Sequence, residues 1–147
     1  MIGPQAGMTR ERFVALVAGA TDEQLSEGLA ANGEAILAGV FERMSKALDA
    51  EAAHGTRAVL EWRVATTADE RPLRFQLAIA DGACTVRRDG DREADVVYTI
   101  GGVDFLRLVT GGAEPGELFV FGRLKVAGDL FLAARSRTFF VPPEERR

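Results

Sequence analysis

The chain has 147 residues, of which 47% are hydrophobic and 27% are charged, a size and balance typical of one soluble globular domain. Its net charge of −4 and its scattered basic residues argue against nucleic acid as a partner, and no apolar run approaches the roughly 20 residues that cross a bilayer. A single cysteine excludes an internal disulfide, and the opening residues lack a secretory-signal pattern, so we expect a cytoplasmic protein.

Helical signals come first along the chain. After a loose arm at residues 1–8, Thr9 can cap a short helix that ends at Gly19. Thr21 and Gln24 then form a capping box, which predicts the start of a second helical segment.

A longer helix is predicted from Glu34 onward. Asn32 and Gly33 interrupt the second segment after about residue 31. Beyond them, apolar residues recur at the spacing of one helix face, at Ile36, Leu37, Val40, Phe41, Met44 and Leu48.

Strand patterns fill the middle of the chain. Apolar residues alternate with polar ones over residues 60–64 and again over 73–79, as half-buried strands require. The Asp81–Gly82 pair predicts a tight hairpin turn into a third strand at 84–86, and a fourth strand is expected at 95–100. We interpret these segments as a run of antiparallel strands with one apolar face.

The last third mixes helices with one more strand. A short helix is predicted at 103–109, a glycine and proline loop at 110–116, and a helical turn at 117–121. A strand at 123–127 follows, and Asp129 can cap a final helix. The expected fold is α+β: a mainly antiparallel five-stranded sheet covered on one face by helices, with its arginines and glutamates on the other face in water.

Groups able to do chemistry are few. We interpret His54, the only histidine, as a residue at a helix end, and Cys84, the only cysteine, as a small buried hydrophobe. Asp104 and Asp129 lie behind glycines at helix starts, where capping or a dipole contact explains them. The loop at 111–116 lacks the pattern of a phosphate-binding loop. We therefore predict a protein without catalytic activity, metal or cofactor.

Apolar side chains are in surplus between Phe105 and Phe140. Core packing explains most of them. The helices predicted there are apolar on several sides, however, and a helix that faces both a sheet and a second apolar surface can line a cavity. The pattern leaves both interpretations open.

Two stretches of this region carry a family resemblance. In FVFGRLKVAGDLFLA, an aromatic residue precedes a glycine and a basic residue that open a short strand, and Gly-Asp then begins a helix. The residues concerned are Phe121, Gly122, Arg123, Leu124, Lys125, Gly128, Asp129 and Ala133. In ADVVYTIGGVDFLRLVTG, a strand leads into an Asp-Phe-Leu helix and a glycine, at Asp104, Phe105, Leu106 and Gly111. Together these stretches resemble the sterol carrier protein 2 family.

The resemblance, which covers about residues 34–140, implies a domain organisation. A sterol carrier protein 2-like domain is expected at residues 34–141, preceded by a helical extension at 1–33 and followed by a tail at 142–147. Peroxisomal relatives end in a small-basic-leucine signal, whereas this chain ends in Glu-Arg-Arg, so the resemblance does not imply a peroxisomal location. The family's fold has an apolar tunnel between the sheet and the C-terminal helices.

The function implied is a non-catalytic carrier that binds a fatty acid, a fatty acyl-CoA, a sterol or a similar apolar ligand. Apolar side chains from the strands and C-terminal helices are the expected tunnel wall: Trp62, Phe75, Leu77, Phe105, Leu106, Val109, Leu118, Phe119, Phe121, Leu124, Val126, Leu130, Phe131 and Phe140. Arg123 or Lys125 is the expected contact for a lipid head group.

Other functions are compatible with the same sequence. The tunnel could be filled by the protein's own phenylalanines, which would make the chain an accessory or scaffold domain that binds a protein partner. An enzyme acting on a lipid would need an acid–base pair, for which Asp104 and Asp129 are the candidates. Transient contact with a membrane and formation of a homodimer are both left open.

Overall fold

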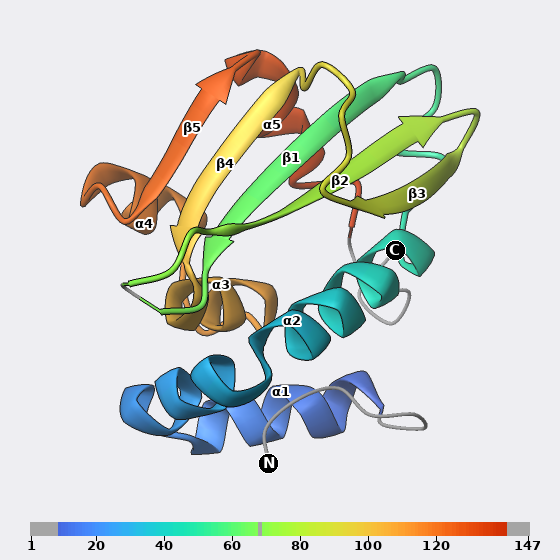
Figure 1. Ribbon diagram of the computed structural model, residues 1–147. Helices are drawn as coiled ribbons and strands as arrows, with labels where there is room; N and C mark the ends of the chain where they lie inside the picture. The colour runs from blue at the N-terminus through green and yellow to red at the C-terminus, as the bar shows by residue number, and fades with distance from the viewer. Residues whose placement is uncertain (1–8, 68, 141–147) are drawn as a thin grey trace.

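A five-stranded sheet and a layer of helices make up the computed structural model, which describes residues 9–67 and 69–140 (Figure 1). The predicted arm at 1–8 and tail at 142–147 lie outside the described residues. In Figure 1, α5 lies behind the sheet, α2 and α3 lie below it, and α1 lies below α2. No helix in the part of the chain that the structure describes has the length and apolar character to cross a bilayer.

The two N-terminal helices begin at the predicted caps. In α1 (Arg10–Gly19), the hydroxyl of Thr9 accepts a hydrogen bond from the backbone of Arg12, 3.1 Å away. The capping box of α2 (Asp22–Lys46) is complete, with both reciprocal bonds between Thr21 and Gln24 present. The expected division after residue 31 is a kink inside α2 rather than the end of a helix, because only Asn32 leaves helical geometry, with φ −138°.

Five strands form one sheet in the order β3-β2-β1-β4-β5. Their bounds are β1 (Ala58–Ala65), β2 (Leu73–Ala80), β3 (Ala83–Arg88), β4 (Val96–Gly101) and β5 (Leu124–Gly128). The predicted hairpin between β2 and β3 is present: Asp81 and Gly82 both have positive φ, 54° and 75°, as a type I′ turn requires. Strands β3 and β5 are the edges of the sheet.

One strand pairing differs from the expected antiparallel run. β4 does not lie beside β3 but pairs in parallel with β1, with Trp62 opposite Tyr98. The connection at 89–95 carries the chain across to β4, and it is fastened to β2 by Gln76: its Nε2 donates to the carbonyl of Arg92 over 2.8 Å, and its Oε1 accepts from the backbone N–H of Arg92. The fold class is otherwise confirmed, since the remaining pairs are antiparallel.

The C-terminal helices are short: α3 (Gly102–Val109), α4 (Pro115–Val120) and α5 (Leu130–Ser136). As predicted, Asp129 caps α5, its carboxylate accepting from the backbone of Leu132 over 3.0 Å. Asp104 lies in the first turn of α3 but does not cap it. Its carboxylate instead pairs with Arg123, just ahead of β5.

A guanidinium on α3 joins the N-terminal helices to the rest of the fold. Arg107 donates to the carbonyls of Val17 and Ala20 and to the carboxylate of Asp22, over 2.7, 2.9 and 2.9 Å. The Val17 carbonyl lies in the last turn of α1, where it also accepts from the backbone N–H of Ala20 over 3.2 Å, and the Ala20 carbonyl lies in the α1–α2 turn. The described part of the predicted extension therefore packs on the domain rather than standing apart from it.

Strand register separates a covered face of the sheet from an open one. Residues paired across strands share a face, so Leu60, Trp62 and Val64 face the helices together with their partners on β2 and β4. Helix α2 packs on β2 and β3, α3 on β1 and β4, and α5 on β4 and β5. The opposite face carries Glu61 and Arg63 and is the open face.

Candidate functional site

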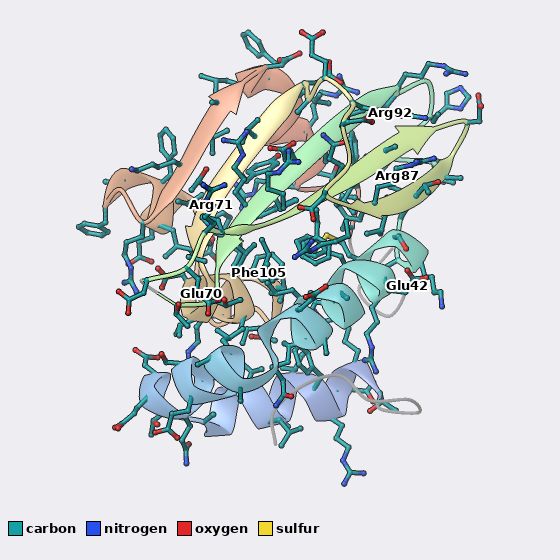
Figure 2. All side chains as sticks on the ribbon, in the orientation of Figure 1. Glu42, Glu70, Arg71, Arg87, Arg92 and Phe105 are labelled. Carbon is teal, nitrogen blue, oxygen red and sulfur yellow. The ribbon has the colours of Figure 1, made fainter. Side chains whose placement is uncertain are left out.

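An aromatic cluster occupies the space between the covered face and the helices. Phe41 of α2 stacks on Phe75 and on Phe105, with ring centroids 4.6 and 5.1 Å apart. Trp62 meets Phe105 edge-on at 5.4 Å and stacks on Tyr98 at 4.2 Å. Figure 2 labels Phe105 on α3, beneath the sheet. The cluster thus joins Phe41 of α2 and Phe105 of α3 to the three central strands of the sheet, β2, β1 and β4.

Within this cluster, Trp62 is the member that the helices do not fully cover. Phe75 and Tyr98, its partners across the two neighbouring strands, are 1% and 6% exposed, whereas Trp62 is only half-buried. Its ring lies on the covered face, against Phe105 of α3 and against Tyr98, whose hydroxyl is bonded to Ser136 of α5.

The fourteen predicted wall residues divide into three sets. Six are buried: Phe75, Leu77, Phe105, Leu106, Leu118 and Leu124. Four are half-buried against the core: Trp62, Val109, Val126 and Phe140. The other four lie on the surface, around the two ends of β5: Phe119, Phe121, Leu130 and Phe131. The structure brings the first two sets together with the core and leaves the third set outside it.

The two predicted head-group cations have different surroundings. Arg123 forms a two-pronged ion pair with Asp104, in which Nε donates to Oδ2 over 3.0 Å and a terminal nitrogen contacts Oδ1. Lys125 is exposed and has no ion-pair partner within residues 9–67 and 69–140. Lys125 is therefore the cation available to an added anion.

The structure also places the other three residues that the sequence offered for chemistry, Cys84, His54 and Asp129. Burial raises the pKa of Cys84 to about 11, so the thiol stays protonated at neutral pH, in agreement with its interpretation as a small hydrophobe. His54 is exposed in the turn region that follows α2. Asp129 is occupied as the cap of α5.

Three residues of the site were missed from the sequence. Phe41 was assigned to a helix face without a role, although it stacks on two other rings of the cluster. Tyr98 and Ser136 form a hydrogen bond between β4 and α5, 2.7 Å long and buried. The alternation of Val96, Tyr98 and Ile100 could have placed Tyr98 on the covered face, but nothing in the sequence pairs it with Ser136.

The open face of the sheet has a different character, with an open cleft of about 590 Å³ whose lining includes Arg63, Arg71, Arg74 and Thr99. Glu61 is buried among these groups. It accepts from Arg63 Nε over 2.6 Å, from Gln76 over 2.9 Å and from Arg74 over 3.3 Å. Burial raises the pKa of Glu61, but the hydrogen bonds from Gln76 and Arg63 and the two arginine charges outweigh burial and leave the pKa lowered.

Comparison with known proteins gives a family match over most of the chain. The model of the SCP-2 sterol transfer family matches residues 37–141. Sterol carrier protein 2 of Rattus norvegicus is 24% identical over 111 residues, which make up 74% of this chain and 20% of the rat protein. The chain thus spans about one fifth of the length of the curated relatives it matches.

Solved structures share the fold. Palmitated SCP2L2 from Aedes aegypti has a TM-score of 0.55 and 21% identity, covering 65% of this chain and 86% of that one. A sec-alkylsulfatase from Pseudomonas sp. has a TM-score of 0.56 and 18% identity, covering 71% of this chain but 16% of the sulfatase. At these identities the likeness is one of fold alone.

Proposed function

Because the chain belongs to the SCP-2 sterol transfer family, we propose that it is a lipid carrier without catalytic activity, acting in the cytoplasm. Its ligand is a fatty acid, a fatty acyl-CoA, a sterol or a similar apolar molecule. The ligand lies between the sheet and helices α3 and α5, against Trp62. The observation that carries this proposal is the half-buried indole on the helix-covered face of the sheet, between the buried Phe75 and Tyr98.

The energetics suit reversible binding. A sixteen-carbon chain gains about 0.8 kcal/mol for each buried methylene, or about 12 kcal/mol in all. Association costs about 4–15 kcal/mol. At the low end of that cost about 8 kcal/mol remains, which corresponds to a dissociation constant of about 1 μM, a range that suits reversible holding of a cargo.

A charged head group would lie at the β5 end of the site. Lys125 is the free cation there, but its register partner Thr99 is on the open face, so its ammonium group meets a head group only around the edge of the sheet. Arg123 would have to leave Asp104 first. Reversing both charges is therefore expected to weaken binding of a fatty acid more than binding of an uncharged sterol.

The experiment uses the single tryptophan of the chain. Freshly purified protein is first analysed by native mass spectrometry for copurified lipid, then delipidated and titrated with palmitate while Trp62 fluorescence is followed. We expect a saturable change in emission and a rise in melting temperature. A Val126→Asp variant, which places a charge on the half-buried covered face of β5, should lose both effects, and the exposed-site control Leu16→Asp should keep them.

A second function is favoured by the packing of the rings. Phe41, Phe75 and Phe105 are each at most 1% exposed, and Phe41 stacks on both of the other rings. Such packing is typical of a filled interior. The chain would then be an accessory or scaffold domain that binds a protein partner. A bare mass in native mass spectrometry, together with no thermal shift on adding fatty acid or sterol, would favour this function over the carrier.

A further inference from the structure

Exposed large hydrophobic side chains are concentrated in one part of the surface. Of six such residues in the part of the chain that the structure describes, five fall within residues 119–131. These five form what we call the β5-edge stripe: Phe119, Val120, Phe121, Leu130 and Phe131. Single exposed apolar residues need no explanation, but a group of this size indicates an interaction surface.

The stripe is divided between the two ends of an edge strand. Helix α4 ends just before β5 and α5 begins just after it, so each end of β5 carries one half of the stripe. Figure 1 shows β5 at one side of the sheet, where among the described strands it pairs only with β4. Backbone N–H and C=O groups of a strand point to both of its sides, so the outer edge of β5 presents groups that β4 does not pair.

A second copy of the same strand meets both requirements. When two β5 strands pair antiparallel about a two-fold axis, the beginning of one lies beside the end of the other. The α4 half of the stripe in each copy then meets the α5 half in the other copy. Pairing of β5 with β3 of another copy would leave half of the stripe uncovered and would continue into an open filament.

Side-chain alternation selects the register of this pairing. Residues opposite each other in an antiparallel pair share a face of the sheet, and Lys125 and Ala127 lie on the open face with Thr99 and Val97. Pairing centred on Lys125 would place two lysines opposite each other. Pairing centred on Val126 uses all five residues of β5, and it places Lys125 of one copy opposite Ala127 of the partner subunit.

The same register brings opposite charges together. Just beyond the paired strands, Arg123 of one copy approaches Asp129 of the partner subunit, and the two-fold axis repeats this contact. Both side chains belong to exposed residues. Arg123 can keep its contact with Asp104, and Asp129 its contact with Leu132, because each has further donors or acceptors.

The area available is enough for a specific dimer. A phenylalanine side chain presents about 200 Å². The rings of Phe119, Phe121 and Phe131 are 52%, 73% and 87% exposed, so they offer about 400 Å² in each copy. Burying these rings, Val120, Leu130 and the strand edges of both copies removes about 1,200 Å² from water, which is the lower limit for a standard interface.

We propose that the protein forms a two-fold dimer through β5, in register about Val126, and that the β5-edge stripe is its interface. The two five-stranded sheets join into one continuous sheet whose outer edges are the β3 strands. The partner is a second copy of this chain because the stripe, the strand edge and the charges all complement themselves under one two-fold rotation. The proposal does not rest on the carrier function.

The test measures the mass of delipidated protein by sedimentation equilibrium from low micromolar to submillimolar concentration. We expect a monomer–dimer equilibrium. Replacing Phe121 and Phe131 together by serine should raise the dissociation constant at least about 100-fold, because each dimer loses four rings from its interface. The control Leu16→Ser changes an exposed leucine on α1, away from β5, and should dimerise as the parent does.

A charge at position 127 tests the register itself. Ala127→Glu places a carboxylate opposite Lys125 of the partner subunit twice in each dimer, so the dissociation constant should fall about 2- to 30-fold. Ala127→Lys places like charges there and should raise it by a similar factor. Matched controls are Thr85→Glu and Thr85→Lys, since Thr85 is an exposed residue of β3, the other edge strand. These controls should leave the dissociation constant unchanged.

Three results would overturn the proposal. The first is a parent that stays monomeric at every concentration, including one that instead binds phosphatidylcholine vesicles through the stripe. The second is a dimer that the serine replacements leave intact. The third is an equal response to glutamate and lysine at position 127. The palmitate titration of Trp62 is made where the protein is monomeric, so failure of dimer formation and failure of the carrier function are distinguishable.

Discussion

The hydroxyl oxygen of Tyr98 on β4 lies 2.7 Å from the hydroxyl oxygen of Ser136 on α5. Ser136 has one hydroxyl hydrogen, which it donates to the carbonyl of Ala133 over 2.8 Å, so Tyr98 is the donor between the two side chains. Burial raises the pKa of Tyr98 and keeps that donor protonated at neutral pH. The bond fastens α5 beside the ring on which Trp62 stacks.

Replacing Tyr98 by phenylalanine tests this link. The ring and its stacking on Trp62 are kept while the donor is lost, so the free energy of unfolding should fall by about 0.5–1.5 kcal/mol. Urea unfolding followed by Trp62 fluorescence measures the loss. The control Ser45→Ala removes an exposed hydroxyl bond on α2 and should change stability by less. A Tyr98→Phe variant as stable as the parent would mean that α5 is held by packing alone.

Glu61 gives stability a defined pH dependence. Its pKa is lower in the folded protein than its ordinary value of 4.5, so its charged form stabilises the fold fully above that value. The stabilisation is lost as pH falls through the lower, folded pKa. Glu61→Gln should therefore lower the free energy of unfolding by about 1–3 kcal/mol at neutral pH. In acid, the difference in free energy of unfolding between this variant and the parent should become smaller.

Unfolding at a series of pH values checks this prediction. Glu42→Gln is the matched control, because Glu42 is exposed on α2 and its ion pair with Lys46, 3.8 Å long, lies on the surface. The free energy of unfolding of Glu42→Gln should have the same pH dependence as that of the parent. If the difference in free energy of unfolding between Glu61→Gln and the parent is the same at neutral and at acid pH, the stabilising role of the Glu61 carboxylate is contradicted.

The two glycines that bracket β5 predict different costs for the same change. Gly128 has φ +104°, and a Cβ there would collide with the backbone carbonyl oxygen of Asp95, which also accepts from the N–H of Asp129. Gly122 has φ +74° with open space around it. Alanine at 122 should cost about 1 kcal/mol in backbone strain, whereas alanine at 128 should cost about 3 kcal/mol or more, since strain and collision add. Thermal unfolding of the two variants in parallel gives the comparison, and equal melting temperatures would contradict it.

Arg107 is predicted to hold the N-terminal helices in place. Arg107→Met keeps the apolar stem but removes three donated hydrogen bonds, and we expect a loss of about 2–3 kcal/mol. Amide hydrogen exchange should become faster in α1 first, while β1 and β2 keep their protection. Arg12→Met, on the exposed side of α1, should leave exchange unchanged. Uniformly faster exchange throughout the sheet would mean that Arg107 supports the whole fold.

How much the sequence predicts depends on how local the physical signal is. The caps at Thr9, Thr21 and Asp129 and the turn at Asp81–Gly82 were predicted correctly, because each depends on residues a few positions apart. The parallel pairing of β4 with β1 was not. It depends on where the connection at 89–95 lies, and Gln76, which holds that connection, gives no sign of this role in the sequence.

The candidate site shows the same limit. Hydrophobicity identified Phe75 and Phe105 as interior residues, and they are buried. Phe121 and Phe131 have the same side chain, but the end of α4 and the first turn of α5 leave them exposed, and no periodicity in six or seven residues distinguishes inside from outside. Likewise, Arg123 and Lys125 look alike in the sequence, and only the structure shows that Arg123 is ion-paired with Asp104.

The parallel pairing of β1 with β4 also sets the order in which the chain can fold. β1, β2 and β3 join through short turns, so their contacts close small loops and can form early. β4 must find β1 across the whole length of β2 and β3, and β5 can be added only after β4. The stacking of Trp62 on Tyr98 belongs to that slower step. In a refolding experiment, the recovery of tryptophan fluorescence should therefore lag behind the recovery of strand circular dichroism, and the site should assemble after the antiparallel β1-β2-β3 part of the sheet.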